Sequence, residues 1–287
     1  STPTLGTSNV RFGVNAGNSI ESGGNYNTVV GDEAGTAITT GDENTFIGYI
    51  SGSANTTGSN NTAIGRASLY NNTTGTYNTA VGRGAGQAVT TGTSNTLIGG
   101  LAGDAITTGI GNVAVGYNAL TVHTTGNNNV AIGNVALESN TTASDIVAVG
   151  VAALRLNTTG ADNVAVGAYS LDANTTGASN TAVGDNSLTA NTTADNNTGI
   201  GYYALKANTT GTRNTAVGES AMVTNTTGNY NVAVGDSSLQ GNTTGSLNVA
   251  LGDFALDANT TGSSNVAVGQ DALGANSTAS NNTALGY

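Results

Sequence analysis

A five-residue word recurs along the chain: an asparagine, a Thr or Val, an alanine, a Val or Ile, and a glycine. The closing glycine returns every 17 residues without a slip, and a uniform period predicts coils that stack in register. An earlier word at 9–13 ends 18 residues before Gly31, which predicts one inserted residue near Gly23–Gly24. The regularly spaced glycines are Gly31, Gly48, Gly65, Gly82, Gly99, Gly116, Gly133, Gly150, Gly167, Gly184, Gly201, Gly218, Gly235, Gly252, Gly269 and Gly286.

The repeat predicts an all-β fold, a parallel β-solenoid built from 17-residue coils. Repeats of two helices need about 33–47 residues, and Asn, Thr and Gly are poor helix formers. The consensus N-[TV]-A-[VI]-G-x-x-[AS]-L-x-x-N-T-T-G-x-x places β-branched residues in one strand and Gly or Asn at tight corners. We expect Thr-Thr to form a second short strand, and a stack roughly 80 Å long at ~4.8 Å per coil. Residues 1–287 then form one repetitive domain, with an irregular first coil at 1–30 and regular repeats from about 27 to 287.

Two apolar columns are expected to fill the core. The first precedes the closing glycine and holds only apolar residues: Val30, Ile47, Ile64, Val81, Ile98, Val115, Ile132, Val149 and so on to Leu285. The second, four places past the glycine, holds Leu or Met in most coils. It holds Gly at Gly35, Gly86 and Gly103, and there the residue before Thr-Thr is Ile38, Val89 or Ile106.

This exchange indicates that the two positions compete for one core volume. Gly52 with Asn55 breaks the rule. We predict that Leu120→Gly destabilises the protein strongly and that adding His123→Ile recovers part of the loss.

The alternation of side chains along the strand predicts how the chain assembles. Successive side chains point to opposite sides, so Val or Ile and Thr or Val share one side, and Asn and Ala share the other. We expect the first side to face the core and the alanines to face a partner chain, because strands that are apolar on both faces are usually buried on both. Small side chains would let three solenoids approach a common axis. A monomer whose alanine stripe faces water is the alternative. The alanines are Ala63, Ala80, Ala114, Ala131, Ala148, Ala165, Ala182, Ala216, Ala233, Ala250 and Ala267.

Asparagine columns predict amide ladders at a corner of the solenoid. One column is interrupted only by Ile146: Asn27, Asn44, Asn61, Asn78, Asn95, Asn112 and Asn129 precede it. The Asn-Thr-Thr words also match the pattern for N-glycosylation, which stays as an alternative. His123, the only histidine, falls in a column of Asn, Ile and Val. We expect it to replace a ladder asparagine rather than act as a base or a ligand.

The words Asn-Val-Ala-Val-Gly at 112–116, Asn-Val-Ala-Ile-Gly at 129–133 and Asn-Thr-Ala-Val-Gly at 78–82 resemble the head repeats of trimeric autotransporter adhesins. The longer unit is similar to repeats in bacteriophage tail fibres and large bacterial surface proteins. The resemblance covers 9–287 and implies a trimer of parallel β-solenoids exposed on a cell or virion. The 17-residue repeat is longer than the adhesin-head unit by about the Asn-Thr-Thr segment. Uncapped end coils would also favour head-to-tail stacking into a filament.

Composition narrows the classes of function. The chain has no cysteine, and its 6 Lys plus Arg with a net charge of −11 argue against a nucleic-acid partner. No apolar run approaches about 18 residues, so we expect no membrane insertion. Leu, Ile, Val and Phe make up only about a fifth of the chain, near the composition of disordered proteins, but in columns they form a thin core. Ser1-Thr2-Pro3-Thr4 does not resemble a signal peptide, so we expect any secretion signal to be absent or already removed.

We expect no enzyme activity, no cofactor and no metal site. A Ser-His-Asp arrangement has no supporting motif, and nothing indicates the paired carboxylates of a glycosidase. The calcium-binding solenoid signature G-G-x-G-x-D is absent, and the acidic residues Asp162, Asp185, Asp236 and Asp253 occupy scattered variable positions. The glycine-rich stretch at 82–86 has no βαβ context. Tyrosines at variable positions are expected to point outwards: Tyr49, Tyr70, Tyr77, Tyr117 and Tyr202.

The expected function is structural and adhesive. The protein would form a rigid extracellular fibre, on a cell surface, in a secreted filament or on a virion, with itself and a host-surface glycan or protein as partners. Ice binding by regular threonine rows is the alternative. The rows are Thr56-Thr73-Thr90-Thr107 and Thr57-Thr74-Thr91-Thr108. Neighbouring threonines point to opposite sides, so only one row can face outwards.

Overall fold

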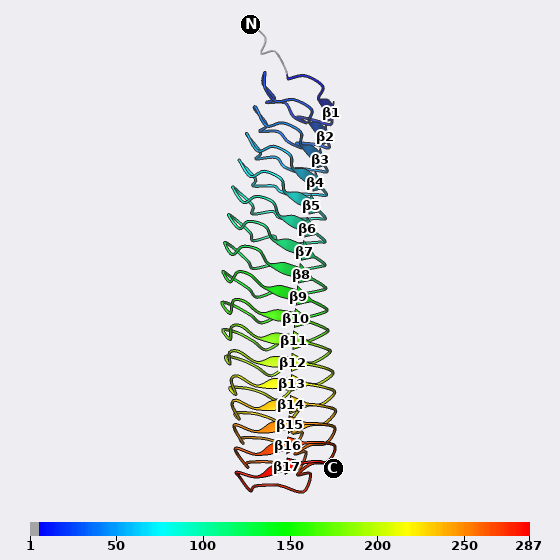
Figure 1. Cartoon of the computed structure of the whole chain (residues 1–287). Helices are drawn as coiled ribbons and strands as arrows, with labels where there is room; N and C mark the ends of the chain where they lie inside the picture. The colour runs from blue at the N-terminus through cyan, green and yellow to red at the C-terminus, as the bar shows by residue number, and fades with distance from the viewer. Residues whose placement is uncertain (1–5) are drawn as a thin grey trace. The chain divides into compact units, whose positions relative to one another are not determined.

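A computed structural model describes residues 6–287 (Figure 1). Ser1-Thr2-Pro3-Thr4, on which the expectation about a secretion signal rests, lies outside the described residues. The chain divides into two units, Ser1–Ser144 and Asp145–Tyr287, and the described residues of each form a stack of coils. Each coil contributes one strand of three residues, and no helix occurs within 6–287. Each unit is thus a β-solenoid.

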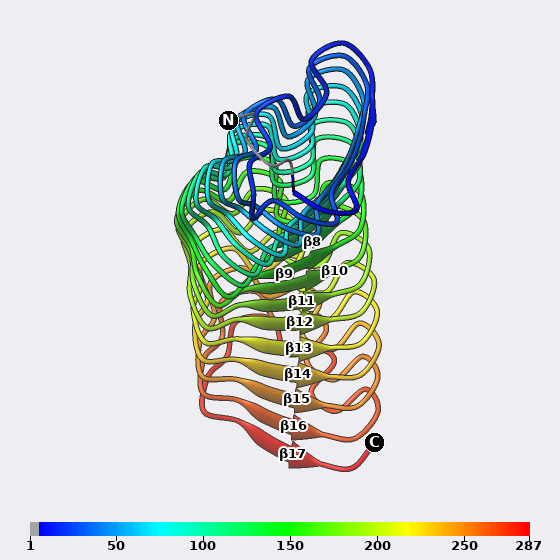
Figure 2. The same cartoon turned by 90° about the horizontal axis from the view of Figure 1, so that it is seen from above.

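The strands of the two units have the same length and the same position in the repeat. Unit 1 contains β1 (Val10–Phe12), β2 (Thr28–Val30), β3 (Thr45–Ile47), β4 (Thr62–Ile64), β5 (Thr79–Val81), β6 (Thr96–Ile98), β7 (Val113–Val115) and β8 (Val130–Ile132). Unit 2 contains β9 (Val147–Val149), β10 (Val164–Val166), β11 (Thr181–Val183), β12 (Thr198–Ile200), β13 (Thr215–Val217), β14 (Val232–Val234), β15 (Val249–Leu251), β16 (Val266–Val268) and β17 (Thr283–Leu285). In Figure 2 the labelled strands β11 to β17 of unit 2 lie one below another along one side of the stack.

Strand pairing confirms the parallel solenoid and its period. Thr62 pairs with Thr79 in a parallel ladder, an offset of one 17-residue repeat. The pairing of Val10 with Thr28 is offset by 18 residues, which confirms the predicted insertion before the regular repeats. The fold class expected from the sequence is therefore correct at the level of a parallel β-solenoid.

The Thr-Thr words form bends, so the prediction of a second strand is wrong. The amide N–H groups of Thr56 and Thr57 both donate to the carbonyl oxygen of Thr73, over 2.9 and 3.3 Å. The Thr56 hydroxyl donates to the same oxygen over 3.0 Å. Because one carbonyl of the next coil receives three donors, the chain turns here instead of extending into a ladder.

The strand faces the core with the opposite side from the one predicted. Ala63 and Ala80 are fully buried, whereas Ile64 is 38% exposed. The Val and Ile column therefore lies on the outside, and the alanine column lies in the core. The physical reason is space, because the interior of a 17-residue coil already holds a leucine such as Leu69 opposite the strand. The space that remains inside the coil fits only a methyl group.

The glycines in the core show that side chains from several sides of the coil fill the same core space. A Cβ at Gly103 would lie 2.7 Å from Leu97 and 2.8 Å from Ile106. A Cβ at Gly86 would lie 2.7 Å from Leu97 and 3.4 Å from Val89. Competition between the leucine column and the residue before Thr-Thr is thus confirmed. The strand wall is a third contributor, because a bulky residue such as Leu97 replaces alanine beside these glycines.

The leucine column has a left-handed backbone. Leu69 has φ 46°, and Gly52, at the same position in the preceding coil, has φ 54°. A left-handed non-glycine residue costs about 1–2 kcal/mol. Burying the side chain returns about 1.5–3 kcal/mol, so leucine is tolerated in this turn. At the end of the strand only glycine fits, since Gly65 has φ 129° and a Cβ there would lie 2.6 Å from the carbonyl oxygen of Gly82.

Two asparagine ladders run inside each unit. The side chain of Asn61 donates to Asn44 Oδ1 over 3.1 Å and to the Gly75 carbonyl oxygen over 2.8 Å. In the second ladder, Asn72 donates to Asn55 Oδ1 over 2.7 Å and to the same Gly75 oxygen over 3.1 Å. The predicted amide ladder is confirmed, and a second one faces it across the same corner. These bonds give the buried side-chain N–H groups of Asn61 and Asn72 their acceptors, although Asn72 Oδ1 itself has no partner.

Candidate functional site

The outer face of the strands is the most distinctive surface of each unit. We call it the sheet face: the side chains at the first and third positions of β2–β8 in unit 1 and of β9–β17 in unit 2. First positions hold Thr or Val, and third positions hold Val, Ile or Leu. The most exposed members with neighbours on both sides are Ile47, Ile64, Ile98, Ile132, Val166, Ile200, Val234 and Leu251, each 36–39% exposed.

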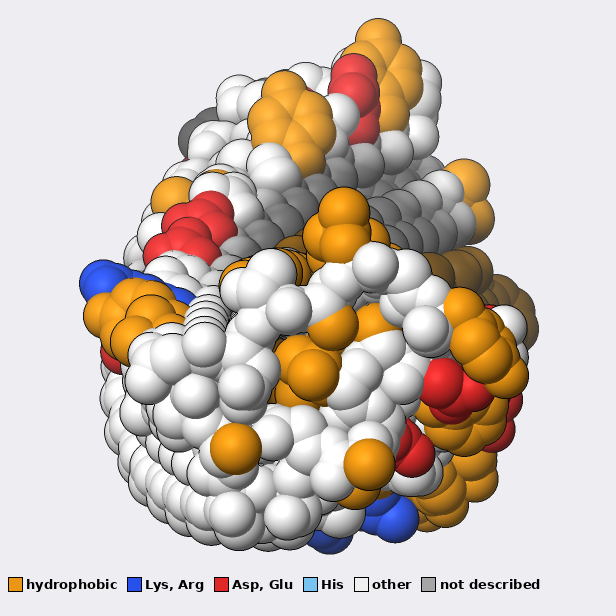
Figure 3. Space-filling view, turned by 60° about the horizontal axis from the view of Figure 1, so that its bottom comes forward, with side chains coloured by type: hydrophobic (Ala, Val, Ile, Leu, Met, Phe, Trp, Pro, Cys, Tyr) orange, Lys and Arg blue, Asp and Glu red, His pale blue; other side chains and the backbone are white. Residues whose placement is uncertain are grey.

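No charged residue occurs at any first or third position of these strands. The solvent-facing side of a sheet in a soluble protein normally carries polar side chains. A large contiguous apolar patch on the surface marks an interaction site. The uncovered face of the strand is therefore uncharged: its third position is apolar in each of these strands, and its first position holds Thr or Val instead of the alanine expected from the sequence. In Figure 3 charged side chains form small separate patches, and most of the visible surface is neither charged nor hydrophobic.

Residues beside the strand carry the aromatic and charged groups. Tyr77 comes two residues before β5 and is 64% exposed, and Tyr117 comes two residues after β7 and is 56% exposed. In unit 2, Arg213 Nη1 donates to the hydroxyl of Tyr230 over 2.6 Å, one coil away. The sheet face is thus bordered along the chain by polar and aromatic side chains, the usual arrangement around an interface core.

His123 lies where the sequence placed it, inside the second asparagine ladder. It is fully buried, with Nε2 2.8 Å from the Gly126 carbonyl oxygen and Nδ1 2.9 Å from Asn140 Nδ2. Nε2 therefore donates to Gly126, and Nδ1 accepts from Asn140. Burial lowers the pKa of His123, and the backbone groups of Gly126 and Asn140 oppose this effect only in part. Nδ1 therefore links His123 to the next coil, and Nε2 closes the corner of its own coil, so His123 has the structural role predicted.

The asparagines of the Asn-Thr-Thr words face inwards. Asn174, for example, is fully buried and donates to Asn157 Oδ1 over 2.8 Å and to the Gly177 carbonyl oxygen over 2.9 Å. An enzyme that attaches a glycan needs access to this amide nitrogen. The folded coil does not offer it.

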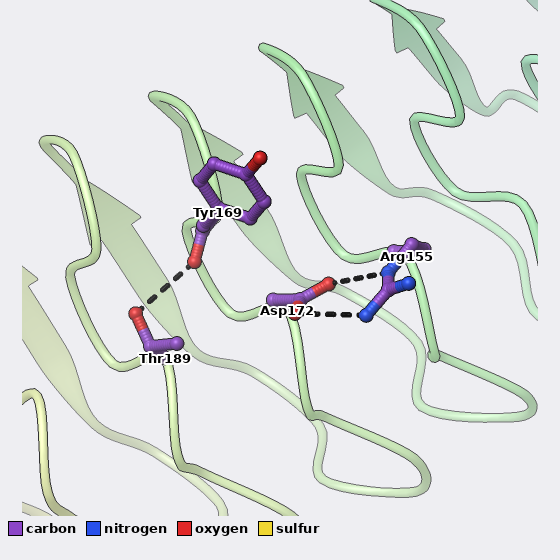
Figure 4. Close-up of polar contacts among 4 residues, drawn as sticks. All are labelled: Arg155, Tyr169, Asp172 and Thr189. Carbon is purple, nitrogen blue, oxygen red and sulfur yellow. Dashed lines mark hydrogen bonds and ion pairs between the residues drawn. The ribbon is translucent and has the colours of Figure 1, made fainter.

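The remaining sequence candidates serve the scaffold. Asp253 accepts a hydrogen bond from the backbone N–H of Asp236 over 3.1 Å, and Gly86 in the 82–86 stretch lines the core beside Leu97. Arg155 and Asp172 form a two-pronged ion pair over 2.9 and 3.2 Å between successive coils (Figure 4). Within 6–287 no three His, Asp or Glu side chains gather in a way that could hold a metal ion.

Tyr202 and Tyr203 form a stacked pair beside Lys206. The rings of Tyr202 and Tyr203 stack with centroids 3.8 Å apart, and Lys206 Nζ lies 3.8 Å over the Tyr203 ring. The hydrogen bond with Tyr203 raises the pKa of Tyr202 to about 12. Tyr49, Tyr77, Tyr117 and Tyr202 are exposed, as predicted, whereas Tyr70 is half-buried.

The threonine corner presents one exposed row. The second threonine of each pair is exposed, as at Thr57 and Thr74. The first is half-buried, and its hydroxyl is occupied: Thr73 Oγ1 donates to the Thr90 carbonyl oxygen over 3.1 Å. Only one row faces outwards, as predicted.

No protein-family model matches the chain, and no curated protein matches it. Within the described part of the chain there is also no helix with the length and apolar character needed to cross a membrane.

Proposed function

We propose that this protein is a structural and adhesive fibre protein whose sheet face is buried between copies of the same chain. The observation that carries the proposal is the uncharged, β-branched sheet face. A side chain such as Ile98, 39% exposed in the single chain, gains about 25 cal/mol for each Å² of apolar surface that it buries. Repetition in every coil multiplies this small gain along the face.

Three copies around a common axis are the arrangement that we propose. The resemblance of the repeat words to the heads of trimeric adhesins implies this order. The geometry also suits it, because the face is only two side chains wide, with the residue between them, such as Leu97, pointing into the core. A narrow strip can be covered by two neighbours that approach at an angle.

An extracellular location and a rigid, extended form follow from the same proposal. Within each unit, successive coils are hydrogen-bonded through the strand, the Thr-Thr corner and one or both asparagine ladders. Such a lattice resists bending without needing enzymatic chemistry or a cofactor. The protein would extend away from the cell or virion that carries it, and its side or its end would bind a host-surface glycan or protein.

Ice binding remains the alternative from the sequence, and the geometry favours it less. Ordered water at an ice-binding surface requires a broad array of free hydroxyl and methyl groups. The corner offers one exposed row, because the hydroxyls of Thr56 and Thr73 donate to the next coil. The threonines at first positions of the sheet face form a second row, but valine interrupts it from β7 to β10 and from β14 to β16. Thermal hysteresis at high protein concentration would support this alternative, and its absence would remove it.

Electron microscopy of purified protein tests the fibre proposal. We expect rods whose cross-section contains three solenoids, alone or joined end to end. The variant Ile64→Asp/Ile98→Asp/Ile132→Asp places charges on the sheet face in every second coil and should give single solenoids. The matched control Thr74→Asp/Thr108→Asp/Thr142→Asp places the same charges in the same repeats on the exposed threonine row, and it should keep the rods. Single solenoids in the unmodified protein would overturn the proposal.

A further inference from the structure

Three buried oxygen atoms without hydrogen-bond partners lie on two successive coils of unit 1. They are Asp104 Oδ1, Asn118 Oδ1 and Thr121 Oγ1. Asp104 and Thr121 hold the same position of the repeat, 17 residues apart, five places after Gly99 and Gly116. Buried polar atoms are nearly always satisfied, so three orphaned oxygens at neighbouring positions of two successive coils require an explanation.

Side chains at this position reach from one coil to the next. Arg155 and Asp172 occupy the same position in unit 2, and their side chains meet at 2.9 Å (Figure 4). Residues two and five places after the glycine also meet within one turn, since Lys206 Nζ lies 3.8 Å from the Tyr203 ring centre. By the same register, Asp104 and Thr121 are neighbours on successive coils, and Asn118 lies beside Thr121 in one turn.

Thr121 behaves differently from other threonines at its position. Thr189 donates its hydroxyl to the Tyr169 carbonyl oxygen in the preceding coil over 3.1 Å (Figure 4). Thr36 donates to the Glu33 carbonyl oxygen over 2.7 Å. Thr121 makes neither bond, although the carbonyl of Leu101 stands where that of Tyr169 stands for Thr189. The Leu101 carbonyl oxygen is therefore a fourth oxygen beside the cluster.

The cluster has a negative charge, and the Asp104 carboxylate forms no ion pair among the described residues. Residues 84–154 contain neither lysine nor arginine. Burial raises the pKa of the Asp104 carboxyl, and backbone hydrogen bonds from Asp104 and Ala105 only partly oppose the effect. A carboxylate that has lost part of its water is stabilised when a cation takes the place of that water.

We propose that Asp104, Asn118, Thr121 and the Leu101 carbonyl bind a hard divalent cation of the Ca²⁺ type. Carboxylate, amide, hydroxyl and carbonyl oxygens are the ligands that Ca²⁺ takes in proteins. One carboxylate makes a weak site, so the dissociation constant falls in the range of extracellular modules, about 10⁻⁴–10⁻³ M. The site is local, which is why no repeated calcium motif marks it. Its effect is to tie two successive coils together.

Terbium luminescence tests the site. Tb³⁺ occupies Ca²⁺ sites and emits when a nearby tyrosine absorbs, and Tyr117 adjoins Asn118. We expect saturable emission that Ca²⁺ displaces, with one site per chain. Asp104→Asn should weaken Ca²⁺ binding at least ten-fold. Thr121→Val, which keeps the side-chain volume, should weaken it several-fold.

The matched control is Asp257→Asn, which removes a carboxylate at the same repeat position in unit 2. It should leave Ca²⁺ affinity unchanged. Absence of saturable binding would overturn the proposal, and so would equal affinity in Asp104→Asn and Asp257→Asn. Folding of each variant is checked by its circular dichroism, so that a loss of binding is separated from a loss of structure.

Discussion

The ring of Phe46 fills the space beside Gly52, where a Cβ would lie 2.6 Å from two ring carbons. This contact explains the coil that breaks the exchange rule of the sequence. Gly52 has neither a leucine side chain nor an Ile or Val before Thr-Thr to fill the core. The phenylalanine on the strand supplies that volume, so the core is filled from any of three walls.

The Phe46–Gly52 contact predicts a reciprocal rescue. Phe46→Ala should destabilise the protein by about 3–5 kcal/mol, because it opens a cavity in a closed core. Gly52→Leu alone should destabilise by about 1–3 kcal/mol through overpacking. The double variant should recover much of the loss, because Leu69 already adopts the left-handed backbone that Gly52 has. Urea unfolding measures all three, and a double variant no more stable than Phe46→Ala contradicts the shared volume.

The orientation of the strand predicts opposite outcomes at two adjacent residues. Ala131 is fully buried and Ile132 is 39% exposed. Ala131→Leu should cost about 1–3 kcal/mol or more, because the coil already contains the buried Leu137. Ile132→Leu should change the stability of the single chain by less than about 0.5 kcal/mol. Thermal unfolding at a concentration where the chain is monomeric makes the comparison, and the reverse order would restore the orientation expected from the sequence.

The period of the repeat was enough to predict the parallel solenoid, the register of its strands and the asparagine ladder. Alternation also showed that both faces of the strand are apolar. It could not show which face is inside, because Ala63 and Ile64 both suit a core. Only the volume left by Leu69 decides between them, and that volume is a three-dimensional quantity.

The prediction of the outer strand face from the sequence failed for the same reason. The sequence indicated the alternation of the strand, yet it placed the alanines on the outside, where we expected a partner chain, and the structure buries them in the core. The signal that could have corrected this was Phe46, because a phenylalanine in the alanine column fits beside Gly52 only if that column faces inwards. The unpartnered oxygen of Asp104 had no signal in the sequence, since it depends on side-chain packing between coils.

The asparagine ladder predicts a large loss from one buried amide. Asn78 Oδ1 accepts from the backbone N–H and from the side chain of Asn95, both over 3.0 Å, while its Nδ2 donates to Gly92 over 2.8 Å. Asn78→Ala leaves these groups buried and unpaired, at about 1–3 kcal/mol each. Asn71→Ala, at an exposed neighbouring asparagine, is the control and should be nearly neutral. Equal stability of the two variants in urea would show that the ladder contributes nothing.

His123 predicts a specific loss of stability in acid. Burial lowers its pKa in the folded chain, whereas the unfolded chain keeps the ordinary value of 6.5. Below about pH 6.5 the unfolded state therefore binds more protons, and stability falls as the pH decreases towards the lowered folded pKa. His123→Asn, which restores the ladder residue, should flatten the stability curve over this interval. Urea midpoints between pH 7 and pH 5 measure the difference, and parallel curves for the two proteins would contradict it.

Sedimentation equilibrium tests the burial of the sheet face most directly, because it reports the mass of the assembly in solution. The account predicts three times the chain mass of 28.0 kDa for the unmodified protein, or larger multiples of three where trimers join end to end. It predicts 28.0 kDa for Ile64→Asp/Ile98→Asp/Ile132→Asp and no change for the threonine-row control. A mass of 28.0 kDa for the unmodified protein at all concentrations would contradict the central claim.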